Sequence, residues 1–157
     1  MTNQIFTVTL STIACSRKLG VVAPEQMQQI NRELKTAFSP LIKLPNASPE
    51  FSRGDVVQIF IGKGRLGVVV SNDLGNRVSE IIMMSHSSIA NRVKNQFEVK
   101  VSAQWVVGNE GEERNLIVCC NEVDTVDQQK IKKIGRLSDQ DLENINTLLF
   151  YALGIES

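Results

Sequence analysis

The sequence has few cysteines, few aromatic residues, a single histidine and no excess of charge of either sign. Its 157 residues include three cysteines, Cys15, Cys119 and Cys120, an odd number in which two are adjacent. This pattern does not resemble a disulfide framework or a zinc site, so we interpret the cysteines as reduced thiols. Seventeen basic residues balance 17 acidic ones. Because no global field attracts polyanions, any site for a nucleic acid must be local.

The sequence also lacks an apolar run long enough to cross a membrane. Its first 18 residues begin polar and carry their basic pair, Arg17 and Lys18, after the apolar part, which is the reverse of a signal peptide. We therefore predict a soluble, cytoplasmic protein. The length accommodates one domain and an appendage, and a chain of this size can bury a core without disulfides or metals.

Residues 1–50 are predicted to form an N-terminal extension. Apolar residues alternate with threonines over residues 6–10, which predicts a short strand. A helix is predicted to start at Pro24, and its apolar residues recur at helical spacing: Met27, Ile30, Leu34 and Phe38. Three of the four prolines fall within residues 39–50, which predicts an extended linker. This helix is too small to fold alone, so its apolar face must be buried against the rest of the chain, a second subunit or a partner.

After residue 50 the sequence predicts several short strands. Apolar and β-branched segments are separated by turn residues, and the predicted strands are 55–61, 66–71, 79–85, 97–107 and 115–121. Strands at such spacing predict a small antiparallel barrel or sandwich. With a helix at each end of the chain, the fold class is α+β and mainly β.

A helix is predicted at the end of the chain. Ser138 is a good N-cap, and Asp141 follows three residues later as in a capping box. The apolar stripe of this helix comprises Leu142, Ile145, Leu148, Leu149 and Ala152. Gly154 stands where a helix commonly ends.

Three motifs in this second part resemble a known family. They are the Arg-Gly-Asp that opens a strand at 53–55, the Ser-Asn-Asp turn at 71–73 with its following Asn76-Arg77, and the Gly-Arg-Leu-Ser-Asp at 135–139 that opens the last helix. With their spacing, these motifs make residues 53–155 similar to the MazF/PemK family of toxin endoribonucleases, so we define residues 51–157 as the barrel domain. The resemblance implies an SH3-like barrel that works as a homodimer and cuts single-stranded RNA without a metal or other cofactor. It also implies that an acidic antitoxin segment blocks the RNA groove.

The resemblance assigns site residues as well. The family's active arginine precedes the asparagine of the turn by seven residues, which corresponds to Arg65, and its catalytic threonine corresponds to Ser88. A guanidinium can stabilise the charge that builds on phosphoryl oxygens when a 2′-hydroxyl attacks, and a hydroxyl can add a donor. The resemblance assigns no role to a histidine here, but His86 lies two residues from Ser88, on the same face if the strand persists, and its chemistry suits an accessory acid–base role. The residues predicted to bind RNA are Lys63, Asn72 and Arg77.

The chain differs from the family pattern at four places. Leu66 replaces a proline, only Gly-Lys-Gly precedes Arg65 in place of a long loop, Ser88 replaces threonine, and Asp124 stands where the family has arginine. Two functions therefore stay open: an RNA endonuclease, or a non-catalytic relative that binds nucleic acid, an antitoxin or a gyrase-type partner. For Arg65 the alternative is a solvated strand-edge charge. For His86 a surface group at a strand end, and for Ser88 a loop hydroxyl, are the more ordinary interpretations.

Other polar and aromatic features have ordinary interpretations. The basic run at 130–136 could grip phosphates, but we predict a solvated turn before the helix. For Trp105 we predict burial in the core or in a dimer contact rather than stacking on a base, and for Asp55 hydrogen bonds to nearby backbone. The N-terminal extension could control access to Arg65, or simply enlarge the core or the dimer contact.

Overall fold

The structure is a computed structural model that describes residues 20–38, 50–60, 64–73, 76, 81–90, 92–108 and 111–155. For residues 81–84 only the backbone is described. The strand predicted at residues 6–10 and nearly all of the predicted linker lie outside the described residues, so these predictions and the boundary near residue 50 stay predictions.

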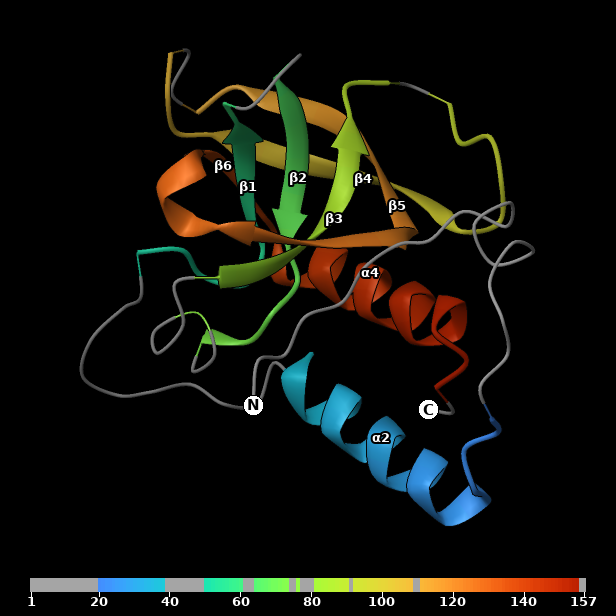
Figure 1. Cartoon of the computed structure of the whole chain (residues 1–157). Coiled ribbons are helices and arrows are strands. Elements are labelled where there is room, and N and C mark those ends of the chain that lie inside the picture. Colours follow the sequence, from blue (N-terminus) through green and yellow to red (C-terminus); the bar gives the residue numbers. More distant parts are fainter. Residues whose placement is uncertain are drawn as a thin grey trace.

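Six antiparallel strands close into a barrel (Figure 1). They are β1 (Asp55–Ile59), β2 (Arg65–Val69), β3 (Ile81–Ser88), β4 (Glu98–Trp105), β5 (Glu113–Asp127) and β6 (Ile131–Leu137). Their order around the barrel is β1-β2-β3-β5-β4-β6, and β6 pairs with β1 to close it. The predicted barrel and the mainly β fold class are confirmed, and each of the five predicted strands is present.

The basic run at 130–136 is where the sequence-based interpretation is wrong. It forms the end of the 3-10 helix η1 (Gln128–Lys130) and the strand β6, instead of a solvated turn. Lys133 Nζ and Arg136 Nη1 each lie 2.8 Å from Oδ1 of Asp55, whose side chain is fully buried. The other oxygen, Oδ2, accepts a hydrogen bond from the backbone N–H of Ser52 at 2.9 Å, which confirms the backbone hydrogen bonding predicted for Asp55. Two of the basic side chains thus neutralise a buried carboxylate, and this pairing lets a lysine-rich segment join the sheet.

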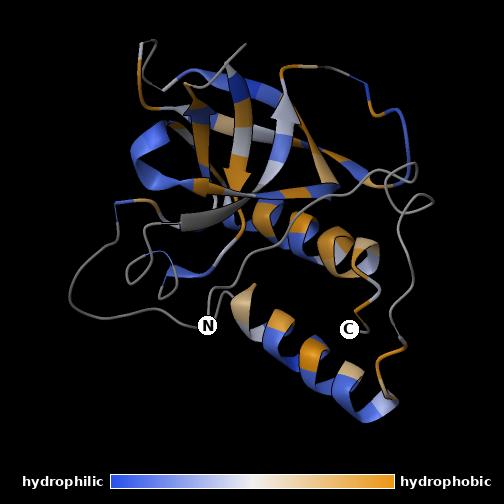
Figure 2. Cartoon of the chain, viewed as in Figure 1, coloured by the Kyte–Doolittle hydropathy of each residue, from blue (hydrophilic) through white to orange (hydrophobic). Residues whose placement is uncertain are grey.

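The C-terminal helix α4 (Asp139–Ala152) begins and ends as predicted. The backbone N–H of Asp141 donates to the Ser138 hydroxyl at 3.1 Å, so Ser138 is the N-cap. At the other end Gly154 has a φ of +67° and the N–H of Ile155 donates to the carbonyl of Phe150, which is a Schellman motif. The helix lies beneath the barrel with its apolar side toward it (Figure 2).

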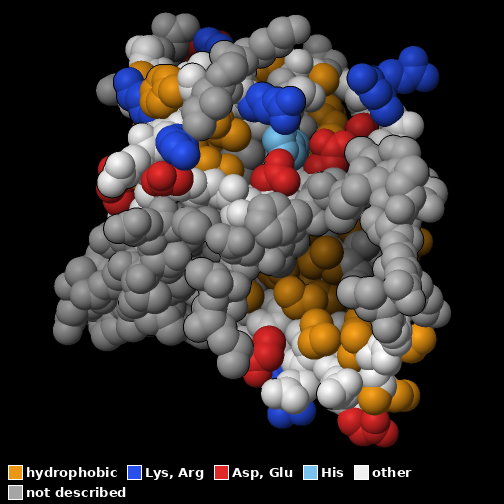
Figure 3. Space-filling model, viewed as in Figure 1, with side chains coloured by type: hydrophobic (Ala, Val, Ile, Leu, Met, Phe, Trp, Pro, Cys, Tyr) orange, Lys and Arg blue, Asp and Glu red, His pale blue; other side chains and the backbone are white. Residues whose placement is uncertain are grey.

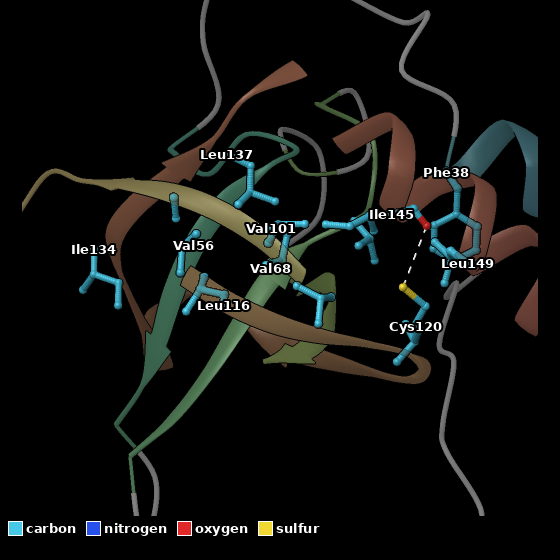
Figure 4. Close-up of a cluster of buried hydrophobic side chains, with 14 of the residues drawn as sticks. Phe38, Val56, Val68, Val101, Leu116, Cys120, Ile134, Leu137, Ile145 and Leu149 are labelled. Carbon is cyan, nitrogen blue, oxygen red and sulfur yellow. Dashed lines mark hydrogen bonds between the residues drawn. The ribbon is translucent and has the colours of Figure 1, made fainter. Parts of the chain in front are cut away.

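The N-terminal helix α2 (Pro24–Ala37) packs on the core cluster through Leu34 and Ala37 at its C-terminal end. Phe38, which follows the helix, is fully buried beside Ile145 and Leu149 of α4 (Figure 4). Met27 and Ile30, at the other end of the predicted apolar face, are 47% and 43% exposed. The face is therefore buried at one end and exposed at the other. Among the helices in the described part of the chain, none is long and apolar enough to cross a membrane.

The adjacent cysteines of β5 lie on opposite sides of the strand. Cys120 is fully buried, Cys119 is half-buried, and both are free thiols. Burial raises the pKa of the Cys120 thiol to about 12. Burial, assisted by Glu122 and Glu98, raises the pKa of the Cys119 thiol to about 11. Because the thiolate is the reactive form, a raised pKa lowers the reactive fraction at a given pH.

We expect iodoacetamide at pH 8 to alkylate these thiols slowly. For Cys119, a pKa of about 11 instead of 9.0 lowers the thiolate fraction roughly a hundredfold. Mass spectrometry of the peptide that contains both cysteines measures the rate in the folded protein, and the same peptide in urea is the control. Equal rates in the two states would contradict the assigned burial.

Candidate active site

The pairing of β2 with β3 brings Arg65 and Ser88 together. Leu66 lies opposite Ser87 and Gly67 lies opposite His86, so the same antiparallel register places Arg65 opposite Ser88. Opposite residues of such a pair have Cβ atoms about 5 Å apart. The predicted neighbourhood of arginine and serine, 23 residues apart in sequence, therefore follows from one strand pairing.

Because side chains alternate along a strand, Arg65 and Ser88 point outward from the barrel. Val68 and Ser85 are fully buried and point into the barrel, whereas Arg65 and Ser88 are exposed. His86 lies two residues from Ser88 on the same strand, so it shares the outer face. Strand β3 ends at Ser88, three residues beyond the predicted end at residue 85, so the polar segment 85–88 belongs to the strand instead of leaving it.

An open pocket surrounds these side chains. It has a volume of about 540 Å³ and is lined by residues 64–66, residues 86–89 and Glu122 of β5. Gly64, with a φ of +61°, supplies the left-handed conformation that leads directly into Arg65. Figure 3 shows the histidine of the chain at the surface, with basic side chains on one side of it and acidic ones on the other.

His86 is paired with an acidic residue that the sequence did not predict as its partner. Its Nε2 atom lies 2.6 Å from Oδ2 of Asp124, and the two side chains are 17% and 40% exposed. The pair forms because β5 shifts register: Ser85 is opposite Val123 but His86 is opposite Cys119, so residues 120–122 have no partner on β3. Asp124 is thereby brought next to the pocket. No periodic signal in the sequence marks this irregularity.

The Ser-Asn-Asp turn supports the scaffold. Asn72 is buried. Its backbone N–H donates a hydrogen bond to the carbonyl of Ala37 at 3.0 Å, and its Nδ2 donates one to the carbonyl of Thr36 at 2.8 Å. It thereby satisfies carbonyls at the C-terminal end of α2. This geometry does not support the predicted RNA contact of Asn72, which stays a prediction. Lys63 and Arg77 lie outside the described residues.

Arg53 of the Arg-Gly-Asp motif is a structural residue as well. Its backbone N–H donates to Asp73 Oδ1 at 2.7 Å, and its guanidinium donates to the carbonyl of Val70 and to the side chain of Asn146. Burial lowers the pKa of this guanidinium to about 10, and the nearby Asp73 opposes part of that shift. Arg53 therefore connects the turn to α4 and does not reach the pocket.

The charges at the pocket are mixed. Arg65 is exposed and cationic, Glu122 lines the pocket, and Asp124 lies against the imidazole. Within the described stretches, no group of three or more histidine, cysteine, aspartate or glutamate residues could hold a metal ion. The arrangement can offer a guanidinium and a hydroxyl to a phosphate, and an imidazole to a proton.

A family model describing PemK-like, MazF-like toxins of type II toxin–antitoxin systems matches residues 42–153. The match spans well over half of the sequence. The chain belongs to this family. Helix α2 precedes the matched residues. Comparison with curated proteins finds no match.

Solved structures of the family share the fold. An endoribonuclease from a mycobacterial species, in complex with its cognate antitoxin, is 19% identical with a TM-score of 0.55, covering 68% of this chain and 98% of that one. The MazE–MazF structure (Form-I) from Deinococcus radiodurans is 20% identical with a TM-score of 0.52, covering 69% and 99%. The Mycobacterium tuberculosis toxin MazF-mt6 is 13% identical with a TM-score of 0.54, covering 66% and 99%. About a third of this chain therefore has no counterpart in these relatives.

Proposed function

We propose that this protein is an endoribonuclease that cleaves single-stranded RNA, and that it is the toxin of a toxin–antitoxin pair. The observation that carries the proposal is the position of Arg65 opposite Ser88 in one open pocket, in a chain of the MazF-like toxin family. Solved relatives described as endoribonucleases have the same fold.

The chemistry follows from the two side chains. The guanidinium of Arg65 binds the phosphoryl oxygens of the scissile phosphate through paired, charge-assisted hydrogen bonds. Ser88 donates a further hydrogen bond from its hydroxyl. Both interactions strengthen as charge develops on these oxygens during attack by the neighbouring 2′-hydroxyl. The bond from phosphorus to the 5′-oxygen then breaks, leaving a 2′,3′-cyclic phosphate and a 5′-hydroxyl.

The same pocket accounts for the proposed partners. In the relatives the toxin is described in complex with its antitoxin. An acidic antitoxin segment that pairs with Arg65 would exclude RNA by competing for the same cation. We further propose that the protein works as a homodimer in which both subunits line the RNA groove, and that Lys63 and Arg77 contact the RNA backbone.

A second candidate function is binding without cleavage. The acids Glu122 and Asp124 favour it, because they place negative charge at a pocket that must receive a phosphate. In that case the protein would bind RNA, an antitoxin or another partner and leave RNA intact.

The two functions are separated by incubating the purified protein with a long RNA of mixed sequence in EDTA. We expect discrete cleavage products without added metal, since the proposed chemistry needs only groups of this chain. Addition of excess magnesium should change the rate little. Activity that is absent in EDTA and appears with magnesium would contradict the metal-independent mechanism, and intact RNA under both conditions would favour the binding function.

A further inference from the structure

We propose that His86 is the general base of the reaction and that Asp124 is its positioning residue, an inference that rests on the proposed ribonuclease function. His86 lines the same pocket as Arg65 and Ser88. Its Nε2 atom lies 2.6 Å from Oδ2 of Asp124, a distance typical of a strong, charge-assisted hydrogen bond.

The contact fixes which ring nitrogen can accept a proton. An ionised carboxylate only accepts hydrogen bonds, so the hydrogen in this contact is on Nε2 of His86. In the neutral ring Nδ1 is then the acceptor, and no second hydrogen bond to the ring occurs among the described residues. The carboxylate of Asp124 holds the ring in this tautomer and stabilises the imidazolium that forms when Nδ1 takes a proton.

The positions of the three side chains suit one nucleotide. Arg65 lies opposite Ser88, and His86 is two residues from Ser88 on the same face, which is roughly 7 Å along the strand. In RNA the 2′-oxygen and the 3′-phosphate are on neighbouring carbons of one ribose. A phosphate held by Arg65 and Ser88 therefore presents its 2′-hydroxyl within reach of the imidazole.

The proposed step moves one proton and exchanges one bond at phosphorus. The 2′-hydroxyl proton moves to Nδ1 of His86, and the 2′-oxygen uses its electron pair to form a bond to phosphorus. The bond from phosphorus to the 5′-oxygen breaks, its electron pair stays on that oxygen, and the oxygen takes a proton from water. His86 then returns its proton to solvent. No oxidant, metal or further reactant is needed.

The first test is the pH dependence of cleavage under single-turnover conditions in EDTA. We expect the wild-type rate, measured over about pH 5 to 8, to rise with pH, because a general base must lose its proton before it can act. In His86→Gln we expect a rate at least about a hundredfold lower, with this rise absent and little change in KM. Because the chain has one histidine, no other imidazole can replace it.

Other groups around the ring remain in the His86→Gln variant, so a limb of the profile that this variant loses belongs to His86. The charged or titratable groups that face the ring or lie next to it are Arg65 on β2, Asp124, Glu122 and Cys119 on β5, and Glu98 on β4, which reaches the Cys119 thiol. The pKa of Cys119 is raised to about 11 by burial, so this thiol stays protonated across the range.

A double-mutant cycle tests the role of Asp124. We expect Asp124→Asn to lower the rate at least about tenfold in the wild type and to have almost no further effect in His86→Gln, because residues that act as a unit are not additive. Glu112→Gln is the matched control, since this acid is 43% exposed and also holds a basic partner, Arg114, at 2.9 Å. The control should keep the wild-type rate and profile.

The outcomes separate this inference from the proposed function. RNA cleavage by the wild type with a flat profile, or wild-type rates in His86→Gln, would overturn the base and leave the ribonuclease standing. Equal losses from Asp124→Asn in both backgrounds would overturn its positioning role. RNA left intact by the wild type would overturn both proposals. If His86→Gln melts early, the wild-type profile alone decides.

Discussion

Replacement of Arg65 by alanine is expected to lower the rate of RNA cleavage at least about a hundredfold, the usual cost of removing one group that stabilises transition-state charge. The side chain is exposed at the end of β2, and no ion pair to it is found among the described residues. Its removal should therefore cost the fold little. We expect a large loss of activity with an almost unchanged melting temperature.

Two further variants sharpen this prediction. Arg65→Lys keeps the charge but loses the planar pair of donors, so its rate should fall between those of the wild type and the alanine variant. Arg32→Ala removes an exposed arginine from α2 and should leave cleavage unchanged. Wild-type cleavage by Arg65→Ala would show that this residue is only a solvated strand-edge group.

Truncation of Leu149 is expected to have the largest effect on stability. Leu149 and Ile145 are the fully buried residues of α4, and Leu149 packs in the cluster that joins α4, Phe38 and the barrel (Figure 4). Leu149→Ala should lower the free energy of unfolding by about 2–5 kcal/mol, the range for buried leucines. In a chain of this length this corresponds to a fall in melting temperature of roughly 5–15 °C.

The matched control is Leu148→Ala, which removes the same atoms from the neighbouring position. Leu148 is only half-buried at the edge of the cluster, so its truncation should cost clearly less. Differential scanning calorimetry of the two variants measures the difference. Equal effects, or a larger effect at Leu148, would mean that α4 is rotated about its axis so that Leu149 is not its more deeply buried leucine.

Short-range patterns predicted those parts of the fold that depend on neighbouring residues. Ser138 and Gly154 delimit α4 because capping is a local interaction, and alternation revealed five strands because one face of each is buried. The sequence does not predict strand β6, because its basic side chains suggest a segment exposed to solvent. The sheet tolerates them because Lys133 and Arg136 form ion pairs with Asp55, about 80 residues earlier in the chain.

The sequence predicts only part of the site, because local patterns do not report contacts between residues that are distant in the chain. Arg65 and Ser88 could be placed by motif spacing, because one strand pairing determines their proximity. The partner of His86 could not, because it depends on the register shift in β5 that brings Asp124 next to β3. The structural role of Asn72 could not be predicted either. Its side-chain amide donates a hydrogen bond to α2, 36 residues earlier in the chain, and no local pattern predicts such a contact.

The contact of α2 with the barrel domain bears on the role of the N-terminal extension. Phe38 fills the core beside α4, and Asn72 satisfies the last carbonyls of the helix. These contacts support the interpretation that the extension enlarges the core. Control of access to Arg65 by the extension stays a prediction.

The most direct test of the central claim is the chemical nature of the fragment ends. Attack by the 2′-hydroxyl at a phosphate held by Arg65 and Ser88 predicts, after cleavage in EDTA, fragments with a 2′,3′-cyclic phosphate at one end and a 5′-hydroxyl at the other. Mass spectrometry of the products of a defined oligoribonucleotide distinguishes these ends. The oligonucleotide should contain a sequence that the protein cuts in the long RNA. Fragments with a 3′-hydroxyl and a 5′-phosphate would contradict the account, and so would an oligonucleotide that stays intact.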